Sequence, residues 1–176
     1  PSLIPACRKA AAAYPHIKIL NCSVAMPYPG VRTYYCRIYE GKFIAGALAG
    51  AMTRTDTLGY IASSPIFGVP AGINAFALGA RLTNPRARVL LRWSCVEDNS
   101  LPALLAAGAD LISNRDLPFP GRPREQWGLN LLEANGTVRS LGSPIWNWGI
   151  FYEKLLKGIL QGHWGDTVYD SEPRAL

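Results

Sequence analysis

The sequence predicts an α/β fold with a mainly parallel sheet that is flanked by helices. Residues 58–62 and 89–93 are short apolar runs typical of buried strands, and apolar residues at helical spacing lie between them. A strand, a helix and a second strand in this order form the unit of parallel sheets, because a parallel pairing needs a long crossover connection. The chain has 176 residues, of which 49% are hydrophobic, and it is therefore long enough to bury such a core.

The connection between these two strands supplies the first candidate ligand site. Turn-forming residues at 63–65 end the first strand, and Pro70 fits the first turn of a helix, where no backbone N–H is needed. Asn84 ends that helix, because a residue before proline avoids the α conformation. Ligands of open α/β sheets lie at the carboxyl ends of the strands, so we expect Phe67 and Trp93 to face a ligand.

The residues before this unit predict two helices and one strand. An alanine-rich helix is followed by a strand at residues 17–20 and by a second helix that ends near residue 52. The second helix contains Gly41, Gly46 and Gly50, and each glycine lowers helix propensity by about 1 kcal/mol relative to alanine. We therefore expect this helix to press closely against the sheet or against a neighbouring helix.

The residues after the unit predict a third strand and a hairpin. A helix precedes the strand at residues 109–113, so Asn114 and Asp116 follow its carboxyl end. Asn135 and Gly136 lie between two apolar runs and predict the turn of a β-hairpin. The two polar residues after the third strand are suited to recognise the edge of a ligand.

A last helix, at residues 150–161, follows the aromatic segment SPIWNWG. Trp146 and Trp148 are two residues apart, so they point the same way on an extended chain. Flat heteroaromatic rings bind by stacking on aromatic faces, while polar groups recognise the ring edge. Ordinary core packing is the competing interpretation of each aromatic residue. The candidate ligand-binding residues are Phe67, Trp93, Asn114, Asp116, Trp146, Asn147 and Trp148.

The composition argues against several other functions. The net charge is +6, but the basic residues are scattered and form no run, so no direct nucleic-acid contact is expected. The four cysteines have no metal-ligand spacing, and the sequence contains no phosphate loop or nucleophile elbow, so we expect no enzyme activity, no metal and no cofactor. Cysteines at irregular spacing are more often unpaired, which favours a reducing compartment.

Three blocks of sequence carry a resemblance to a known family. They are, in order, RIYEGKFIAGALAGAMTRTDTLGYIA, PIFGVPAGINAFALGARLTNP and SPIWNWGIFYEKLLKGILQGHW. These blocks resemble the basic membrane protein (BMP) family of type I periplasmic-binding-protein relatives. Members of that family are typically the substrate-binding components of ABC transporters for purine nucleosides or nucleobases. The resemblance implies a type I periplasmic-binding-protein-like lobe and covers the chain from about residue 14 to residue 164.

The resemblance also implies a domain organisation in which this chain is a fragment of a two-lobed protein. Residues 1–54 would be the C-terminal part of lobe one, with a helix near the hinge. Residues 55–164 would be the α/β ligand-binding domain of lobe two, and residues 165–176 would return towards lobe one. The segment from residue 117 to 141 departs from the family pattern, which leaves the ligand open.

By resemblance, the ligand would be a purine nucleoside or nucleobase, and the partners would be an ABC transporter permease and the missing N-terminal lobe. The same resemblance implies an extracytoplasmic lipoprotein anchored to the membrane. The alternative function is a cytoplasmic ligand-sensing domain of a regulatory protein with the same fold, which unpaired cysteines would suit. The sequence encoded upstream of the chain distinguishes the two, because a signal peptide would select the transporter function.

Overall fold

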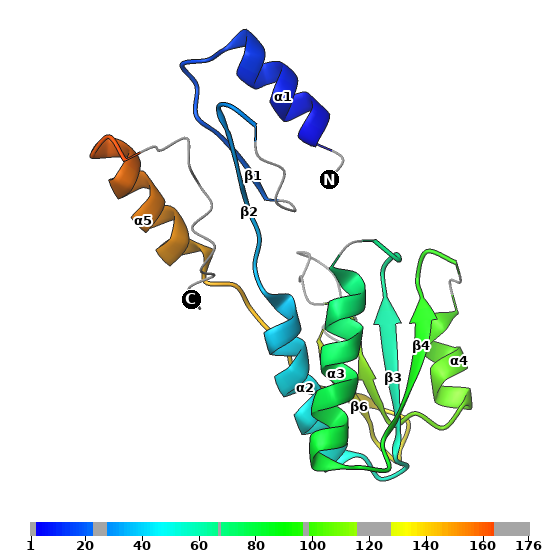
Figure 1. Ribbon diagram of the computed structural model, residues 1–176. Coiled ribbons are helices and arrows are strands. Elements are labelled where there is room, and N and C mark those ends of the chain that lie inside the picture. Colours follow the sequence, from blue (N-terminus) through cyan, green and yellow to red (C-terminus); the bar gives the residue numbers. More distant parts are fainter. Residues whose placement is uncertain (1–2, 23–27, 67, 97–98, 116–127, 164–176) are drawn as a thin grey trace. The chain divides into compact units, whose positions relative to one another are not determined.

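The structure is a computed structural model that describes residues 3–22, 28–66, 68–96, 99–115 and 128–163 (Figure 1). Its contacts divide the chain into two compact units. One unit comprises residues 37–145, and the other comprises residues 1–36 together with residues 146–176. Each unit is described by itself below.

The unit of residues 37–145 is built on a five-stranded sheet with the order β4-β3-β5-β6-β7. The central strand β3 (Thr57–Ala62) pairs in parallel with β4 (Arg88–Trp93) and with β5 (Leu111–Ser113). The strands β6 (Leu129–Leu132) and β7 (Val138–Gly142) extend the sheet by antiparallel pairing. The predicted α/β fold is therefore confirmed, with a parallel sheet over the segment in which it was expected.

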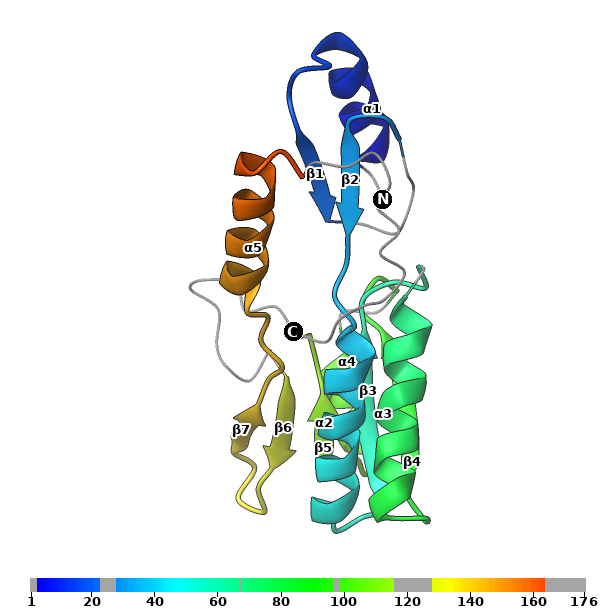
Figure 2. The same cartoon turned by 60° about the vertical axis from the view of Figure 1, so that its left-hand side comes forward.

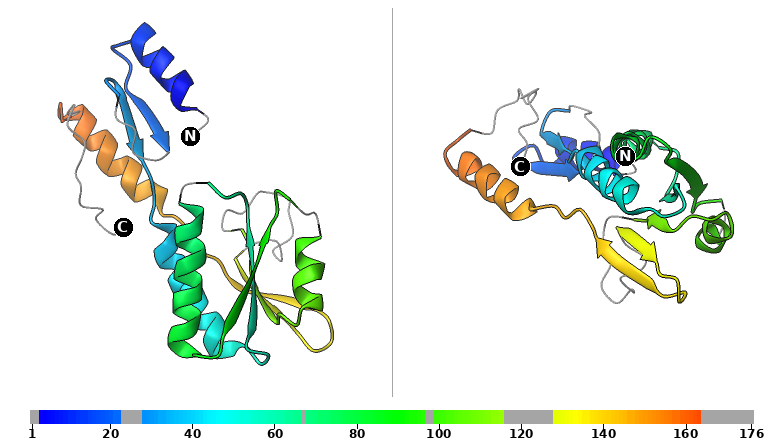
Figure 3. Two further views of the ribbon diagram at one scale, coloured as in Figure 1. Left: turned by 45° about the vertical axis from the view of Figure 1, so that its right-hand side comes forward. Right: turned by 90° about the horizontal axis from the view of Figure 1, so that it is seen from below.

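Helices cover both faces of this sheet (Figure 3). The helices α2 (Ile38–Met52) and α3 (Val69–Thr83) lie on one face, and α4 (Ser100–Ala106) lies on the other. Every residue of β3 is buried, and its side chains alternate between two apolar clusters. Tyr60 packs towards α3, whereas Ile61 packs towards α4, as the two-residue period of a strand requires.

Glycines bring α2 and α3 into backbone contact. A Cβ atom added to Gly46 would overlap the carbonyl oxygen of Phe76, and one added to Gly79 would overlap the carbonyl oxygen of Phe43. Gly50 meets the backbone of Ala80 in the same way. The predicted close packing of the glycine-containing helix is confirmed, and its partner is the neighbouring helix.

The contact between α2 and α3 places both helices in the same unit. The sequence places a boundary after residue 54, which separates α2 from the sheet that follows it. In the structure, α2 belongs to the same unit as the sheet, because its glycine face packs on α3. The chain passes from one unit to the other between residues 36 and 37, and again between residues 145 and 146.

The hairpin β6-β7 has the turn that the sequence predicts (Figure 2). Gly136 adopts a φ of 82°, a conformation that glycine reaches without steric cost. The backbone N–H of Thr137 donates to Oδ1 of Asn135 at 3.0 Å, and the N–H of Glu133 donates to the carbonyl of Thr137 at 2.8 Å. The pair Asn135-Gly136 thus closes the turn through local hydrogen bonds.

The other unit contains a two-stranded parallel sheet and two helices. β1 (Ile19–Cys22) pairs with β2 (Val31–Tyr34), α1 (Ile4–Ala13) packs on both strands, and α5 (Trp148–Leu160) completes the described part. The sequence places the first strand at residues 17–20 and predicts no second strand. In the structure this strand lies two residues later, at Ile19–Cys22, where it pairs with β2. Asn21 is therefore part of β1 and pairs with Thr33.

Among the residues that the structure describes, no helix combines the length and the apolar character needed to cross a membrane.

Candidate functional site

The carboxyl ends of β3, β4 and β5 lie at one edge of the sheet, because these three strands are parallel. Ala62 at the end of β3 pairs with Trp93 at the end of β4. Ser113 ends β5, and Asn114 follows it directly. The first turn of α3 begins next to the same edge, where Gly68 adopts a φ of 88°. We call this set of strand ends the carboxyl edge.

Lys42 is a buried cation at the carboxyl edge. It comes from the first half of α2 and is only 2% exposed. Its Nζ donates to Oγ of Ser113 at 2.9 Å and to the carbonyl oxygen of Asn114 at 3.0 Å. The same Nζ lies 4.9 Å from the centroid of the Tyr60 ring. Burying an ammonium group without partners costs several kcal/mol, and these contacts offset that cost.

Lys42 was not among the residues that the sequence singles out. A lysine in a helix is ordinarily exposed, and its burial here depends on the closeness of α2, β3 and β5. One signal was present in the sequence, since Lys42 is followed in the helix only by apolar residues and glycines, at positions 43–52.

Two of the predicted ligand residues, Trp93 and Asn114, lie at the carboxyl edge. Trp93 is partly buried and packs against the main apolar cluster, which agrees with the core-packing interpretation of this residue. The backbone of Asn114 is held on both sides, because its N–H donates to the carbonyl of Gly128 at 2.7 Å and its carbonyl accepts from Lys42. Its side-chain Oδ1 accepts from the N–H of Arg115 at 2.8 Å.

The other described candidates belong to the second unit. Trp146 is half-buried and Asn147 is exposed in the segment that precedes α5. Trp148 begins α5 and contributes to an aromatic cluster. Phe67 and Asp116 lie outside the described residues. The structure thus brings Trp93 and Asn114 together in one unit and Trp146, Asn147 and Trp148 in the other.

The aromatic cluster consists of Tyr34 on β2 and of Trp148, Phe151 and Tyr152 on α5. The rings of Tyr34 and Phe151 are stacked with centroids 4.9 Å apart, and those of Trp148 and Tyr152 are stacked at 6.1 Å. The hydroxyl groups of Tyr34 and Tyr152 are 2.6 Å apart. The sequence did not single out Tyr34, Phe151 or Tyr152, although the segments TYYCRIY and IFYEK are visibly rich in aromatic residues.

Burial and neighbouring groups shift two pKa values beside this cluster. Desolvation raises the pKa of Tyr34 above its usual value, and the hydrogen bond with Tyr152 adds to the rise. Desolvation also raises the pKa of the Cys22 thiol, which lies opposite Tyr34 in the β1-β2 pairing. Both groups are therefore neutral near pH 7, and the cluster presents rings and hydroxyl groups rather than charge.

A shallow hollow of about 280 Å³ lies between β2 and α5 in the same unit. None of the five candidate ligand residues that the structure describes lines it. Its lining combines basic and apolar residues and consists of Arg32, Phe151, Lys154, Leu155, Gly158 and His163.

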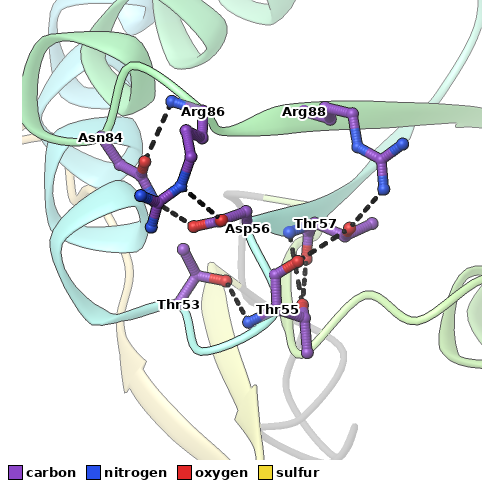
Figure 4. A network of polar contacts seen from close by, with 7 residues as sticks. All are labelled: Thr53, Thr55, Asp56, Thr57, Asn84, Arg86 and Arg88. Carbon is purple, nitrogen blue, oxygen red and sulfur yellow. Dashed lines mark hydrogen bonds and ion pairs between the residues drawn. The ribbon is translucent and has the colours of Figure 1, made fainter.

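The opposite, amino edge of the sheet carries a polar network that has a structural role (Figure 4). Asp56 accepts hydrogen bonds from Nδ2 of Asn84 at 2.7 Å and from Nε of Arg86 at 2.9 Å. These two partners lower the pKa of Asp56, the Arg86 contact being the larger cause. The network joins the loop before β3 to the loop before β4, at the edge away from the expected ligand.

The described residues contain no group of three or more histidine, cysteine, aspartate or glutamate side chains that could hold a metal ion. The four cysteines, Cys7, Cys22, Cys36 and Cys95, have free thiols in the structure.

The α/β unit has polar groups at the carboxyl edge of its parallel strands, and two chain segments join it to the other unit. This combination is typical of ligand-binding proteins. A solved structure has a similar fold. The chain resembles a solute-binding protein of an ABC transporter system from Conexibacter woesei DSM 14684, with a TM-score of 0.62 and 16% sequence identity. The similarity covers 91% of this chain and 59% of that one.

The family model described as Bmp, ABC transporter substrate-binding protein PnrA-like, matches residues 5–106. The chain belongs to this family, as its sequence blocks suggested. The matched residues include α2, β3, α3, β4 and α4, and therefore most of the carboxyl edge.

Two curated relatives have different names. The chain is 35% identical over 144 residues to a provisionally named ABC transporter glucose-binding protein, TsgA13, from Haloferax volcanii. It is 28% identical over 169 residues to a purine-binding protein from Brucella abortus (strain 2308). These matches cover 74% and 89% of this chain, but the chain spans only 37% and 48% of the length of the two relatives. All of these names describe binding proteins, in agreement with the prediction that the chain is not an enzyme.

Proposed function

We propose that this chain is part of the substrate-binding component of an ABC transporter and that it holds its solute at the carboxyl edge. One observation carries the proposal: Lys42, Ser113 and Asn114 meet at the carboxyl edge of the sheet. The family match, which ends at residue 106, includes Lys42 and the strands β3 and β4 of this edge. Ligands of open parallel sheets bind outside the carboxyl ends of the strands. At the amino edge, the polar side chains of Asp56, Asn84 and Arg86 bind one another.

In this proposal, the two units are parts of the two lobes of a binding protein. Residues 37–145 form most of the second lobe, and the unit of β1, β2 and α5 belongs to the first. The proposed boundaries follow the contacts, so they lie at residues 36 and 145 rather than at residues 54 and 164.

The proposed ligand is a purine nucleoside or nucleobase. The purine-binding relative from Brucella abortus supports this class. A purine needs an aromatic face for stacking and polar groups that recognise its edge. The proposed contacts are Trp93 and Asn114 from one unit and Trp146, Asn147 and Trp148 from the other, together with Phe67 and Asp116.

A hexose is the specific competitor to a purine, because the relative from Haloferax volcanii is named as a glucose-binding protein and is 35% identical. Sugars also lie flat on aromatic rings, so the aromatic residues do not distinguish the two ligands. The partner in either case would be a permease, with the protein on the outer side of the membrane. A cytoplasmic ligand-sensing domain with the same fold is the alternative that the upstream coding sequence would decide.

The test is calorimetric titration of the protein encoded by the complete gene with adenosine, guanosine, adenine, hypoxanthine, glucose and ribose. The proposal predicts a saturable isotherm in the micromolar range for at least one purine and none for glucose. Binding of glucose alone would show that the ligand is a hexose rather than a purine, and it would remain compatible with a substrate-binding function. Absence of binding throughout the panel, in protein shown to be folded, would contradict both.

A further inference from the structure

The helix α2 is anchored to β5 at both of its ends. Near its beginning, Lys42 donates to Ser113 and Asn114, which lie at the carboxyl end of β5. At its end, Oγ1 of Thr53 donates to Oδ1 of Asp110 at 2.6 Å, just before β5. The same two elements are thus tied by side-chain hydrogen bonds once at the carboxyl edge and once at the amino edge.

The anchor at the carboxyl edge involves more elements than the one at the amino edge. Lys42 is packed beside Tyr60 of β3, and the first turn of α3 approaches both residues. A Cβ atom added to Gly72 in that turn would lie 3.3 Å from the Tyr60 hydroxyl and 3.6 Å from Cγ of Lys42. Lys42 therefore fixes the end of β5 relative to three other elements that end or begin at the carboxyl edge.

The neighbouring residue of α2 contacts the segment that leaves the unit. A Cβ atom added to Gly41 would lie 3.0 Å from Cβ of Pro144, so the absence of a side chain at residue 41 permits this contact. Pro144 directly precedes the passage to the other unit, and α2 directly follows the first passage. Gly41 and Lys42 are adjacent in the first half of α2. Through them, α2 contacts both the carboxyl edge and the segment that leads to the other unit.

We propose that Lys42 is a positioning residue of the ligand site, because it fixes Asn114 and the end of β5 in the arrangement that the solute contacts. The proposal rests on the proposed function and extends it to a residue that is itself too buried to be a main ligand contact. Its ammonium group satisfies the Ser113 hydroxyl, which is 1% exposed, and the carbonyl of Asn114. Without this donor, the buried Ser113 hydroxyl and the partly buried carbonyl of Asn114 would each lose a hydrogen bond, and the end of β5 would relax.

The experiment compares two variants that each remove one side-chain hydrogen-bond donor between α2 and β5. Lys42→Met keeps the aliphatic stem and removes the donor at the carboxyl edge. Thr53→Val keeps the shape and removes the hydrogen bond from Oγ1 to Asp110, whose other carboxylate oxygen still accepts from the backbone N–H of Arg54. It is therefore the control for the loss of one side-chain donor between the same two elements. Ser113→Ala removes one partner of Lys42 and serves as the second variant, since it leaves the lysine in place.

Two measurements are made on the protein encoded by the complete gene. Hydrogen exchange of the Asn114 amide reports the position of the end of β5 without any ligand. We expect Lys42→Met to raise this exchange rate about tenfold or more, because a hydrogen bond to a charged group is lost, whereas Thr53→Val leaves it within about twofold of the parent. Ser113→Ala should change the rate in the same direction and by less.

Calorimetry then measures the affinity for whichever solute of the panel the parent binds. Lys42→Met should weaken binding about tenfold, and Thr53→Val should leave it within about twofold. Equal losses in the two variants, or unchanged Asn114 exchange in both Lys42→Met and Ser113→Ala, would overturn the positioning role. If the parent binds no solute of the panel, the proposed function fails, while the exchange comparison still decides whether Lys42 positions the end of β5.

Discussion

The backbone contact between α2 and α3 predicts that Gly79→Ala is destabilising. An added Cβ atom would overlap the carbonyl oxygen of Phe43 and lie 2.9 Å from the backbone nitrogen of Ala47. Both neighbours are main-chain atoms of a helix, so they cannot move aside as a flexible side chain would. Overpacking of this kind costs about 1–3 kcal/mol, while alanine regains up to about 1 kcal/mol of helix propensity. Because neither main-chain atom can move aside, the upper part of that range applies, about 2–3 kcal/mol, and the net expectation is a loss of about 1–2 kcal/mol for the unit of residues 37–145.

The matched control is Gly158→Ala in α5, where the nearest heavy atom to an added Cβ is Cβ of His163 at 4.0 Å. This variant gains helix propensity and meets no obstruction, so α5 should become more stable or remain unchanged. Native-state hydrogen exchange resolves the two units separately. Amides in the middle of α3 should exchange about tenfold faster in Gly79→Ala, and amides of α5 should not exchange faster in Gly158→Ala. A Gly79→Ala variant with unchanged exchange in α3 would refute the packing argument.

Three further predictions concern titratable groups. Thiol titration of the unfolded chain under non-reducing conditions should find four free groups, and recovery of two or none would show that cysteines pair. The pKa of Tyr34 is raised in the folded state, so the neutral side chain stabilises the fold. This contribution is fully present below the usual tyrosine pKa of about 10 and is lost as the pH rises above it. Tyr152→Phe should lower the Tyr34 pKa towards its usual value, as measured by ultraviolet titration, and an unchanged pKa would contradict the hydroxyl contact.

The pKa of Asp56 is lowered in the folded state. Its stabilising effect is present above the usual aspartate pKa of about 3.9 and disappears as the pH falls through the lower folded value. Asp56→Asn should reduce the pH dependence of the free energy of unfolding in that range. An unchanged pH dependence would contradict a stabilising role of this network.

Local signals in the sequence predicted much of the fold. The apolar runs that became β3 and β4, the turn at residues 63–65 and the stop at Asn84 each depend on neighbouring residues, and each lies where expected. The hairpin followed from Asn135-Gly136 for the same reason. The strand β2 was missed, because its four residues VRTY have no apolar run and become a strand only by pairing with β1.

The remaining features depend on contacts between distant parts of the chain. The glycines of α2 predict a close neighbour but do not say which one, so the boundary between the units could not be placed from them. The burial of Lys42 requires β3, β5 and α3 to meet around it. The aromatic cluster likewise joins residues of β2 and α5 that are more than a hundred positions apart, as the Tyr34–Tyr152 contact shows.

The most direct measurement of the central claim is a crystal structure of the protein encoded by the complete gene with a purine nucleoside bound. We expect the nucleoside to lie outside the carboxyl ends of β3, β4 and β5, within hydrogen-bond reach of the Asn114 side chain and with its ring against an aromatic residue. A nucleoside bound at the amino edge near Asp56, or in the hollow lined by Arg32 and Lys154, would contradict it.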